Sequence, residues 1–209
     1  MKIILLSDLH GNLPNLDTRD IDGVIIAGDI CPDYIIPQQE WWFQKVFKKW
    51  LFSLPDTIYI PGNHDFCMEK HPSYTKVYYL GDALVYGFPH TNCPGWAFHA
   101  EEEKISNLLL TAPSFSDIVV CHNPPFGICD RADGYDPDNW HIGSAAIKKY
   151  LDIVRPKLCV FGHCHEGYGS VMYNDTLCIN ASYVDRRYVP RNQYLVCDTN
   201  NVSLSVIPC

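Results

Sequence analysis

The sequence lacks the features that would place it in a membrane or on an export route. None of its apolar runs approaches the roughly 18 residues that a membrane-spanning helix needs. The apolar start, residues 1–6, is interrupted at once by Ser7-Asp8-Leu9-His10, so it is too short for a signal peptide. We therefore expect a cytoplasmic protein with no membrane partner, whose first residues form a buried strand.

Positive charge is also scarce. The 209 residues include 16 Lys and Arg against 24 Asp and Glu, which gives a formal net charge of −8. An extensive nucleic-acid-binding face needs a basic surface, so we do not expect one, although the composition allows a local basic patch. The length fits a single domain over residues 1–209, and no linker, repeat or second domain is visible.

The ten cysteines include no Cys-x-x-Cys pair, the spacing typical of structural zinc sites and redox motifs. Several of them lie inside apolar runs that are typical of buried strands: Cys121, Cys159, Cys178 and Cys197. In a chain of this length without an export signal, we interpret them as reduced core thiols. This interpretation agrees with a cytoplasmic location.

The alternation of apolar runs with amphipathic stretches predicts an α/β fold. Buried strands are expected at 1–7, 23–27, 58–61, 118–121 and 157–161, with helices at 38–54, 99–111 and 143–154. Two hairpins, at 77–86 and 170–179, and two strands, at 193–197 and 202–207, complete the prediction. The helix at 38–54 is rich in aromatic residues. We expect it to pack on a sheet, with a partner-binding face as the alternative.

Five of the predicted strands end in side chains that can bind metal ions. These side chains are Asp8 and His10, Asp29, Asn63 and His64, His122, and His163 and His165. Each of these residues alone is compatible with an ordinary polar loop. That explanation would have to hold independently at all five strand ends. Ligand sites in open α/β sheets form where strands end. Carboxylate, imidazole and amide ligands favour paired borderline metals over a structural thiolate zinc site.

Together these residues resemble the signature of the calcineurin-like metallophosphoesterases. The matching motifs are Asp8-x-His10, Gly28-Asp29, Gly62-Asn63-His64-Asp65, His122 and Gly162-His163-Cys164-His165. The stretches 122–131 and 155–169 are similar to the small metallophosphoesterase-domain branch, several members of which are phosphodiesterases. The resemblance implies a four-layer α/β/β/α sandwich of two mixed sheets.

The resemblance also implies a role for each site residue. Two divalent transition-metal ions would be held, one by Asp8, His10 and His165, the other by Asn63, His122 and His163, and both by Asp29. Manganese is expected first, with iron, nickel or zinc as alternatives, and a water between the ions would attack phosphorus. His64 would protonate the leaving oxygen, and Asp65 would hold His64 in place.

Departures from the family pattern bear on the substrate. The usual glycine is missing from the residues after Asp29, so that loop should take another path. Pro61 replaces the arginine found in phosphoprotein phosphatases, and no arginine follows Asp29 closely. Without these guanidinium groups a phosphomonoester dianion is poorly held. We therefore expect a small phosphodiester, such as a cyclic nucleotide, as substrate. A phosphomonoesterase, a dinucleotide-polyphosphate hydrolase and a non-catalytic scaffold are the alternatives.

The predicted loop at 126–141 is long enough to border the site. Three of its residues are candidate substrate contacts: Asp130, Arg131 and His141. Solvated loop charges are an equally good interpretation of all three.

Overall fold

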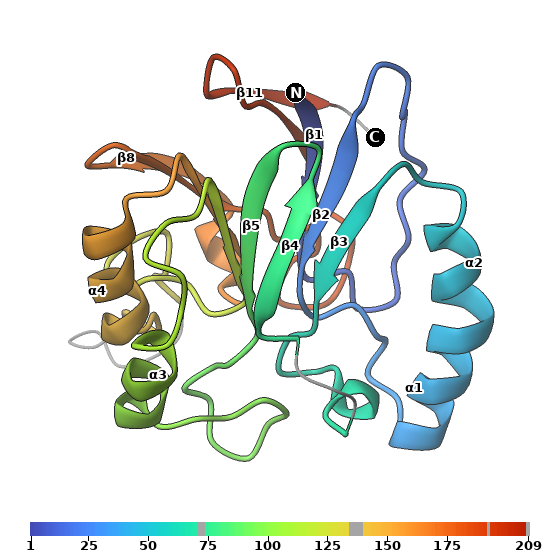
Figure 1. The fold of residues 1–209 in the computed structure, drawn as a ribbon. Coiled ribbons are helices and arrows are strands. Elements are labelled where there is room, and N and C mark those ends of the chain that lie inside the picture. Colours follow the sequence, from blue (N-terminus) through green and yellow to red (C-terminus); the bar gives the residue numbers. More distant parts are fainter. Residues whose placement is uncertain (71–73, 134–139, 192, 208–209) are drawn as a thin grey trace.

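Two β-sheets pack face to face between two layers of helices in the computed structural model, which describes residues 1–70, 74–133, 140–191 and 193–207 (Figure 1). The strand order is β11-β10-β1-β2-β3 in the first sheet and β4-β5-β6-β7-β9-β8 in the second. This is the predicted α/β/β/α sandwich of two mixed sheets.

The first sheet has a parallel centre. β1 (Lys2–Leu6) pairs in parallel with β2 (Gly23–Ala27), and β2 pairs in parallel with β3 (Thr57–Ile60). β10 (Tyr194–Asp198) lies antiparallel to β1, and β11 (Ser203–Ile207) lies antiparallel to β10. Parallel strands bring their C-terminal ends to one edge, so the loops after the three central strands meet there.

The second sheet repeats this arrangement. Its parallel strands are β5 (Ala83–Phe88), β6 (Ile118–Cys121), β7 (Leu158–Phe161) and β9 (Thr176–Asn180). The two hairpins predicted from turn sequences add an antiparallel strand at each edge, β4 (Lys76–Leu80) beside β5 and β8 (Gly169–Tyr173) beside β9. The loops after β6 and β7 therefore also gather at one edge.

One helical layer is built from three consecutive segments, α1 (Ile36–Trp42), the π-helical η1 (Phe43–Phe47) and α2 (Lys48–Leu51). The sequence predicts this helix over residues 38–54, after Pro37. Pro37 instead lies in the first turn, where a proline removes no helical hydrogen bond. A short 3₁₀ turn, η2 (Phe66–Met68), follows β3.

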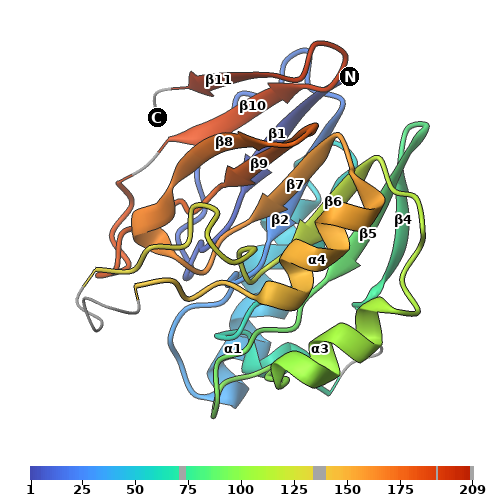
Figure 2. The same cartoon turned by 90° about the vertical axis from the view of Figure 1, so that its left-hand side faces the viewer.

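The other helical layer is α3 (Glu102–Leu109) and α4 (Ala145–Val154), which lie in front of the second sheet in Figure 2. Both helices begin a few residues later than predicted. For α4 the reason is its cap, since the Ser144 side chain accepts a hydrogen bond from the backbone N–H of Ile147. A 3₁₀ turn, η3 (His165–Gly167), follows β7. Among the described residues, no helix has the length and apolar character needed to cross a bilayer.

Strand alternation separates the cores of the sandwich. Ile3 and Leu5 of β1 contribute to the core between the two sheets, whereas Ile4 and Leu6 belong to the core beneath the first helical layer. A third core lies between the second sheet and helices α3 and α4. The core between the two sheets sets the distance between them. It therefore also sets the spacing of the loops at their common edge.

The aromatic helix packs on the first sheet, as predicted. Trp42, Phe43 and Phe47 are buried there, and the Phe47 ring stacks on Phe43 at a centroid distance of 5.3 Å. The neighbouring Phe52 is 87% exposed and lies beyond the packed face.

The packing of this helix predicts a large effect of truncation at position 47. Phe47→Ala removes a fully buried ring and leaves a cavity, which should lower the free energy of unfolding by about 3–5 kcal/mol. Phe52→Ala is the matched control and should change it by less than about 0.5 kcal/mol. Urea titrations of both variants measure the difference, and equal losses would contradict this placement of the helix.

Candidate metal centre

The side chains predicted to bind metal follow strands of both sheets. They lie after β1 (Asp8, His10), β2 (Asp29), β3 (Asn63), β6 (His122) and β7 (His163, His165). Asp8 and His122 are inaccessible to solvent, and Asp29 is 1% exposed. Local turns at five strand ends thus bring these residues to one place, although up to 157 positions separate them in the chain.

Two groups of these side chains converge closely. The ligand atoms of Asp8, His10 and His165 all lie within 4.8 Å of one another, and so do those of Asp8, Asp29 and His122. Asp29 Oδ2 lies 3.6 Å from His10 Nε2 in the first group and 3.3 Å from His122 Nε2 in the second. Asp8 thus belongs to both groups, and Asp29 of the second group also lies close to His10 of the first.

Asn63 and His163 lie beside the second group. Asn63 Oδ1 is 3.0 Å from His122 Nε2, so the amide oxygen points to the same place as the imidazole. The ring of His163 lies 5.3 Å from that of His122 and lines the cavity above the centre. His163 belongs to none of the close groups found among the described residues.

The backbone at this edge adopts an unusual conformation. Four predicted ligands have positive φ angles: Asp8 (52°), His10 (41°), Asp29 (52°) and His163 (66°). Left-handed backbone costs non-glycine residues free energy, and such positions concentrate at functional sites. Asp8, His10 and Asp29 with this backbone belong to the close ligand groups, and His163 lines the cavity beside them.

Two glycines allow the loops to approach one another. A Cβ on Gly62 would overlap the carboxylate of Asp29 and the ring of His122. A Cβ on Gly162 would overlap Asp8 and Ser7. Any side chain at either position would push ligand-bearing loops apart, so both glycines are required by this packing.

The buried carboxylates remain ionised. Burial would raise the pKa of Asp29, but the positive charge of His122 and its hydrogen bond hold that pKa well below its usual range. The pKa of Asp8 is likewise held well below its usual range, by His165 against the effect of burial. Against the effect of burial, these carboxylates raise the pKa of His122 to about 10 and that of His165 to about 9, so the two imidazolium groups balance the buried negative charge. Divalent cations would take over this role, because a metal-bound imidazole is neutral.

Two of the imidazoles, those of His10 and His163, have the neutral form that a metal ligand requires. Burial lowers the pKa of His10 and of His163 to about 4, so both rings are neutral at neutral pH. Both ring nitrogens of His10 are buried, and within the described chain neither has a hydrogen-bond partner. An ion beside Asp29 would satisfy one of these nitrogens. The donor set therefore fits divalent transition metals.

A second layer of contacts orients the ligands. His122 Nδ1 donates to the carbonyl oxygen of Ala27 at 2.8 Å, and His165 Nδ1 donates to that of Asp185 at 2.9 Å. These hydrogen bonds leave Nε2 of each ring facing the centre. Ser182 Oγ donates to Asp8 Oδ2 at 2.7 Å and fixes that carboxylate.

Comparison with known proteins agrees with this geometry. The sequence profile of the calcineurin-like phosphoesterase family matches residues 1–167. The chain belongs to this family. Metallophosphoesterase domain-containing protein 1 from Homo sapiens is 27% identical over 238 residues, which cover 94% of this chain and 70% of that protein. Family membership supports phosphoester hydrolysis as the activity, and the described ligand groups support metal binding.

Solved structures share the fold. The protein TT1561 of Thermus thermophilus has a TM-score of 0.59 and 15% identity, and the match covers 98% of this chain and 96% of that one. A phosphopantetheinyl hydrolase from Mycobacterium tuberculosis has a TM-score of 0.54 and 15% identity, with 90% of each chain covered. At these identities the likeness shows the calcineurin-like phosphoesterase fold alone.

In this calcineurin-like phosphoesterase, the predicted contact between His64 and Asp65 is wrong. His64 Nδ1 lies 2.6 Å from Asp33 Oδ1 instead. Asp33 sits in the loop after Asp29, where the usual glycine is missing, and its side chain is 45% exposed. That missing glycine was the sequence signal for a changed loop, but no local pattern connected it with His64.

The Asp65 carboxylate binds backbone instead of imidazole. It accepts hydrogen bonds from the N–H groups of Ile30 (3.0 Å), Cys31 (2.7 Å) and Gly62 (2.8 Å). Burial and the nearby charge of Asp29 raise the pKa of Asp65 to about 6 against these hydrogen bonds. Asp65 therefore joins the loop after β2 to the loop after β3.

Helix α1 supports the same turn through Gln39. The Gln39 amide nitrogen donates to the carbonyl oxygen of His64 at 2.8 Å, and its oxygen accepts from the N–H of Cys67 at 3.2 Å. Sequence analysis missed this residue because a single glutamine on a helix carries no pattern.

The three candidate substrate contacts separate into different environments. Asp130 is 1% exposed and accepts from His141 Nδ1 at 2.7 Å and from the backbone N–H of Gly143, so it ties its own loop together. Arg131 lies over the ring of Trp140 at 4.6 Å. Of the three, His141 lines the cavity above the metal centre. Residues 134–139 of the predicted loop lie outside the described residues.

A cavity of about 580 Å³ opens over the centre and is bordered by residues that sequence analysis missed. Trp96 lies 4.2 Å from the His64 ring, and Tyr188 stacks on His10 at 4.0 Å. Arg186 also lines the cavity. The available signal was Arg186-Arg187, the one pair of adjacent arginines in the sequence.

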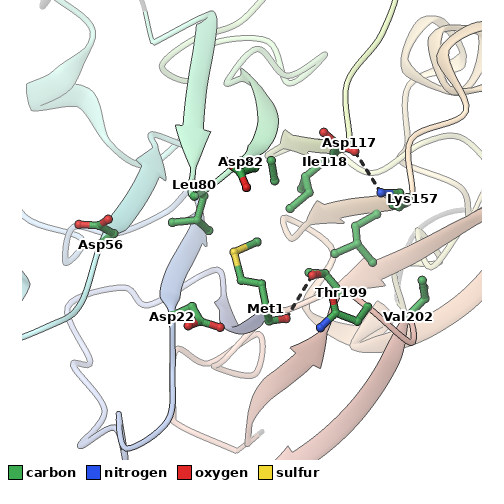
Figure 3. Close-up of a pocket in the computed structure, with 14 residues that line it drawn as sticks. Met1, Asp22, Asp56, Leu80, Asp82, Asp117, Ile118, Lys157, Thr199 and Val202 are labelled. Atoms are coloured by element: carbon green, nitrogen blue, oxygen red, sulfur yellow. Dashed lines mark hydrogen bonds and ion pairs between the residues drawn. The ribbon is translucent and has the colours of Figure 1, made fainter.

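A larger cavity, of about 980 Å³, lies at the other end of the parallel strands (Figure 3). Its lining includes Asp22, Asp56, Asp117 and Lys157, the residues that precede β2, β3, β6 and β7. Its described lining contains no predicted metal ligand, so size does not identify the functional site here.

The contrast between Asp65 and Asp33 can be tested by truncation. Asp65→Ala leaves three buried N–H groups without an acceptor and should lower the free energy of unfolding by about 3 kcal/mol or more. Asp33→Ala removes a half-exposed side chain and should cost about 0.5 kcal/mol. Denaturant titrations of the two variants measure this. A larger loss for Asp33→Ala would contradict the assignment.

Proposed function

We propose that the protein is a two-metal phosphodiesterase that acts on small phosphodiesters. The observation that carries this proposal is the convergence of Asp8, His10 and His165 with Asp29, Asn63 and His122 beneath one open cavity. His163 completes the proposed ligand set from the cavity wall. Two divalent ions held there, manganese by preference, would lower the pKa of bound water and offset charge on phosphoryl oxygens.

His64 is the proposed general acid. Its Nδ1 lies 2.6 Å from Asp33 Oδ1. In the imidazolium form Nδ1–H would donate to Asp33, and the proton on Nε2 would pass to the leaving oxygen. Its ring lines the cavity and lies 4.7 Å from that of His10. Asp33, rather than Asp65, is the group that positions it.

The cationic groups near the centre favour diesters. Among the described residues that line the metal-site cavity, Arg186 is the one arginine or lysine. A phosphomonoester carries two negative charges and is best held by several guanidinium donors, whereas a diester carries one. This supports the interpretation that the missing arginines beside Asp29 and Asn63 favour a diester.

Metal dependence and diester preference can be measured together. Chelation should abolish hydrolysis, and manganese should restore it, because the proposed ligands can activate water only through the metal ions that they bind. Restored protein should hydrolyse bis(p-nitrophenyl) phosphate with a kcat/KM about tenfold above that for p-nitrophenyl phosphate, the equivalent of one charge-assisted hydrogen bond. Activity that survives complete chelation contradicts the metal dependence. A preference for the monoester assigns the protein to the phosphomonoesterases.

The role of His64 predicts a dependence on the leaving group. His64→Ala should slow hydrolysis of a nucleoside cyclic phosphate by ~10²–10⁴, because a ribose oxygen must be protonated as it leaves. The p-nitrophenolate ion is stable without a proton, so bis(p-nitrophenyl) phosphate should be affected much less. Elemental analysis should find the metal content unchanged. Loss of metal, or equal slowing on both substrates, would show that His64 does not act as the acid.

A further inference from the structure

A second cavity, of about 510 Å³, adjoins the one above the metal centre. Four residues line both: Asp133, His165, Glu166 and Arg186. Arg187 and Arg191 line the second cavity only, so three guanidinium groups border it. A molecule bound at the metal centre can therefore extend into it past Arg186.

These three arginines differ from the other three in the chain. Arg19 pairs with Asp17 at 2.6 Å, Arg155 pairs with Asp175 at 3.9 Å, and Arg131 lies over Trp140. By contrast, no described residue forms an ion pair or side-chain hydrogen bond with the guanidinium group of Arg186, Arg187 or Arg191. Their donors are available to a ligand.

The cavity also contains carboxylates. Asp185 is near enough for the charges of Arg191 and Arg187 to act on it, but it lies outside ion-pair distance of both guanidinium groups. Asp185 accepts hydrogen bonds from the backbone N–H groups of Arg187 at 2.9 Å and Val189 at 3.2 Å. Its carboxylate thus shapes the turn. Asp133 and Glu166 are exposed, and neither lies within ion-pair distance of the three guanidinium groups.

The arginines are carried by a turn that is fastened to the metal centre. The carbonyl oxygen of Asp185 accepts from His165 Nδ1, and the Tyr188 ring stacks on His10. Asn12 donates to the carbonyl oxygen of Tyr188 at 3.2 Å. Both sides of the Arg186-Arg187 turn are therefore held by proposed metal ligands or their neighbours, and this positions the turn relative to the metal centre.

We propose that this cavity, defined here as the arginine subsite, binds a second phosphate group of the substrate. The inference rests on the proposed function and names the substrate class: a phosphodiester that carries a further phosphate beyond the bond that is cleaved. Guanidinium groups suit this ligand because their paired N–H donors match the oxygens of a phosphate dianion. The diester itself would lie over the metal centre.

A matched pair of substrates tests the subsite. Thymidine 5′-(p-nitrophenyl phosphate) and its 3′-phosphorylated derivative share the nucleoside, the scissile bond and the leaving group, and differ by one phosphate. The manganese-loaded protein should prefer the phosphorylated compound by about tenfold or more in kcat/KM. Arg186→Gln and Arg187→Gln should each bring this ratio toward one, mainly through KM. Arg19→Gln is the control and should leave the ratio unchanged.

A binding measurement separates failure of the subsite from failure of the proposed function. Calorimetry should show that the manganese-loaded protein binds thymidine 3′,5′-bisphosphate more tightly than thymidine 5′-monophosphate, and that Arg186→Gln removes the difference. If neither ester is hydrolysed, the phosphodiesterase proposal fails and this comparison decides the subsite alone. Equal affinities, or a preference that persists in folded Arg186→Gln and Arg187→Gln proteins, overturn the subsite.

Discussion

The burial of two ionised carboxylates, Asp8 and Asp29, is the constraint on which the rest of the site depends. Each is held by donors from other loops: the N–H of His163 and the hydroxyl of Ser182 reach Asp8, and the N–H of His64 reaches Asp29 at 2.8 Å. These bonds compensate only part of the cost of burying charge. A pair of divalent cations would offset the remaining cost. The imidazoles around the carboxylates are placed to bind the same cations.

The sandwich supplies the rigidity that such a site needs. Its loops come from both sheets, so their spacing is set by the apolar core between the sheets. Asp65 and Gln39 then fasten the turn that carries Asn63 and His64, one to the loop after β2 and the other to helix α1. Because these fastenings use buried hydrogen bonds, the turn cannot shift without leaving donors unsatisfied. A few buried polar side chains therefore connect the stability of the fold to the position of the residues in the site.

The turn at residues 185–188 connects the metal centre with the adjoining cavity. It orients His165, covers His10 with Tyr188 and carries the arginines that line the adjoining cavity. Guanidinium groups are absent beside Asp29 and Asn63, and those of Arg186, Arg187 and Arg191 line the adjoining cavity instead. Their place next to the metal centre, rather than over it, favours a substrate with one charge at the reacting phosphorus and more charge beyond it.

The sequence by itself determined the layers and the ligand candidates, because both are local properties. Apolar alternation marks a strand, and a polar turn directly after it marks the edge where strands end. Only the tertiary structure decided which side chains meet across that edge. His64 pairs with Asp33 instead of its neighbour Asp65, and Arg186 lines a cavity together with Asp29 and Asn63 from the first third of the chain. Such contacts depend on how two sheets pack and on left-handed turns at Asp8, Asp29 and His163, and no spacing along one strand encodes them.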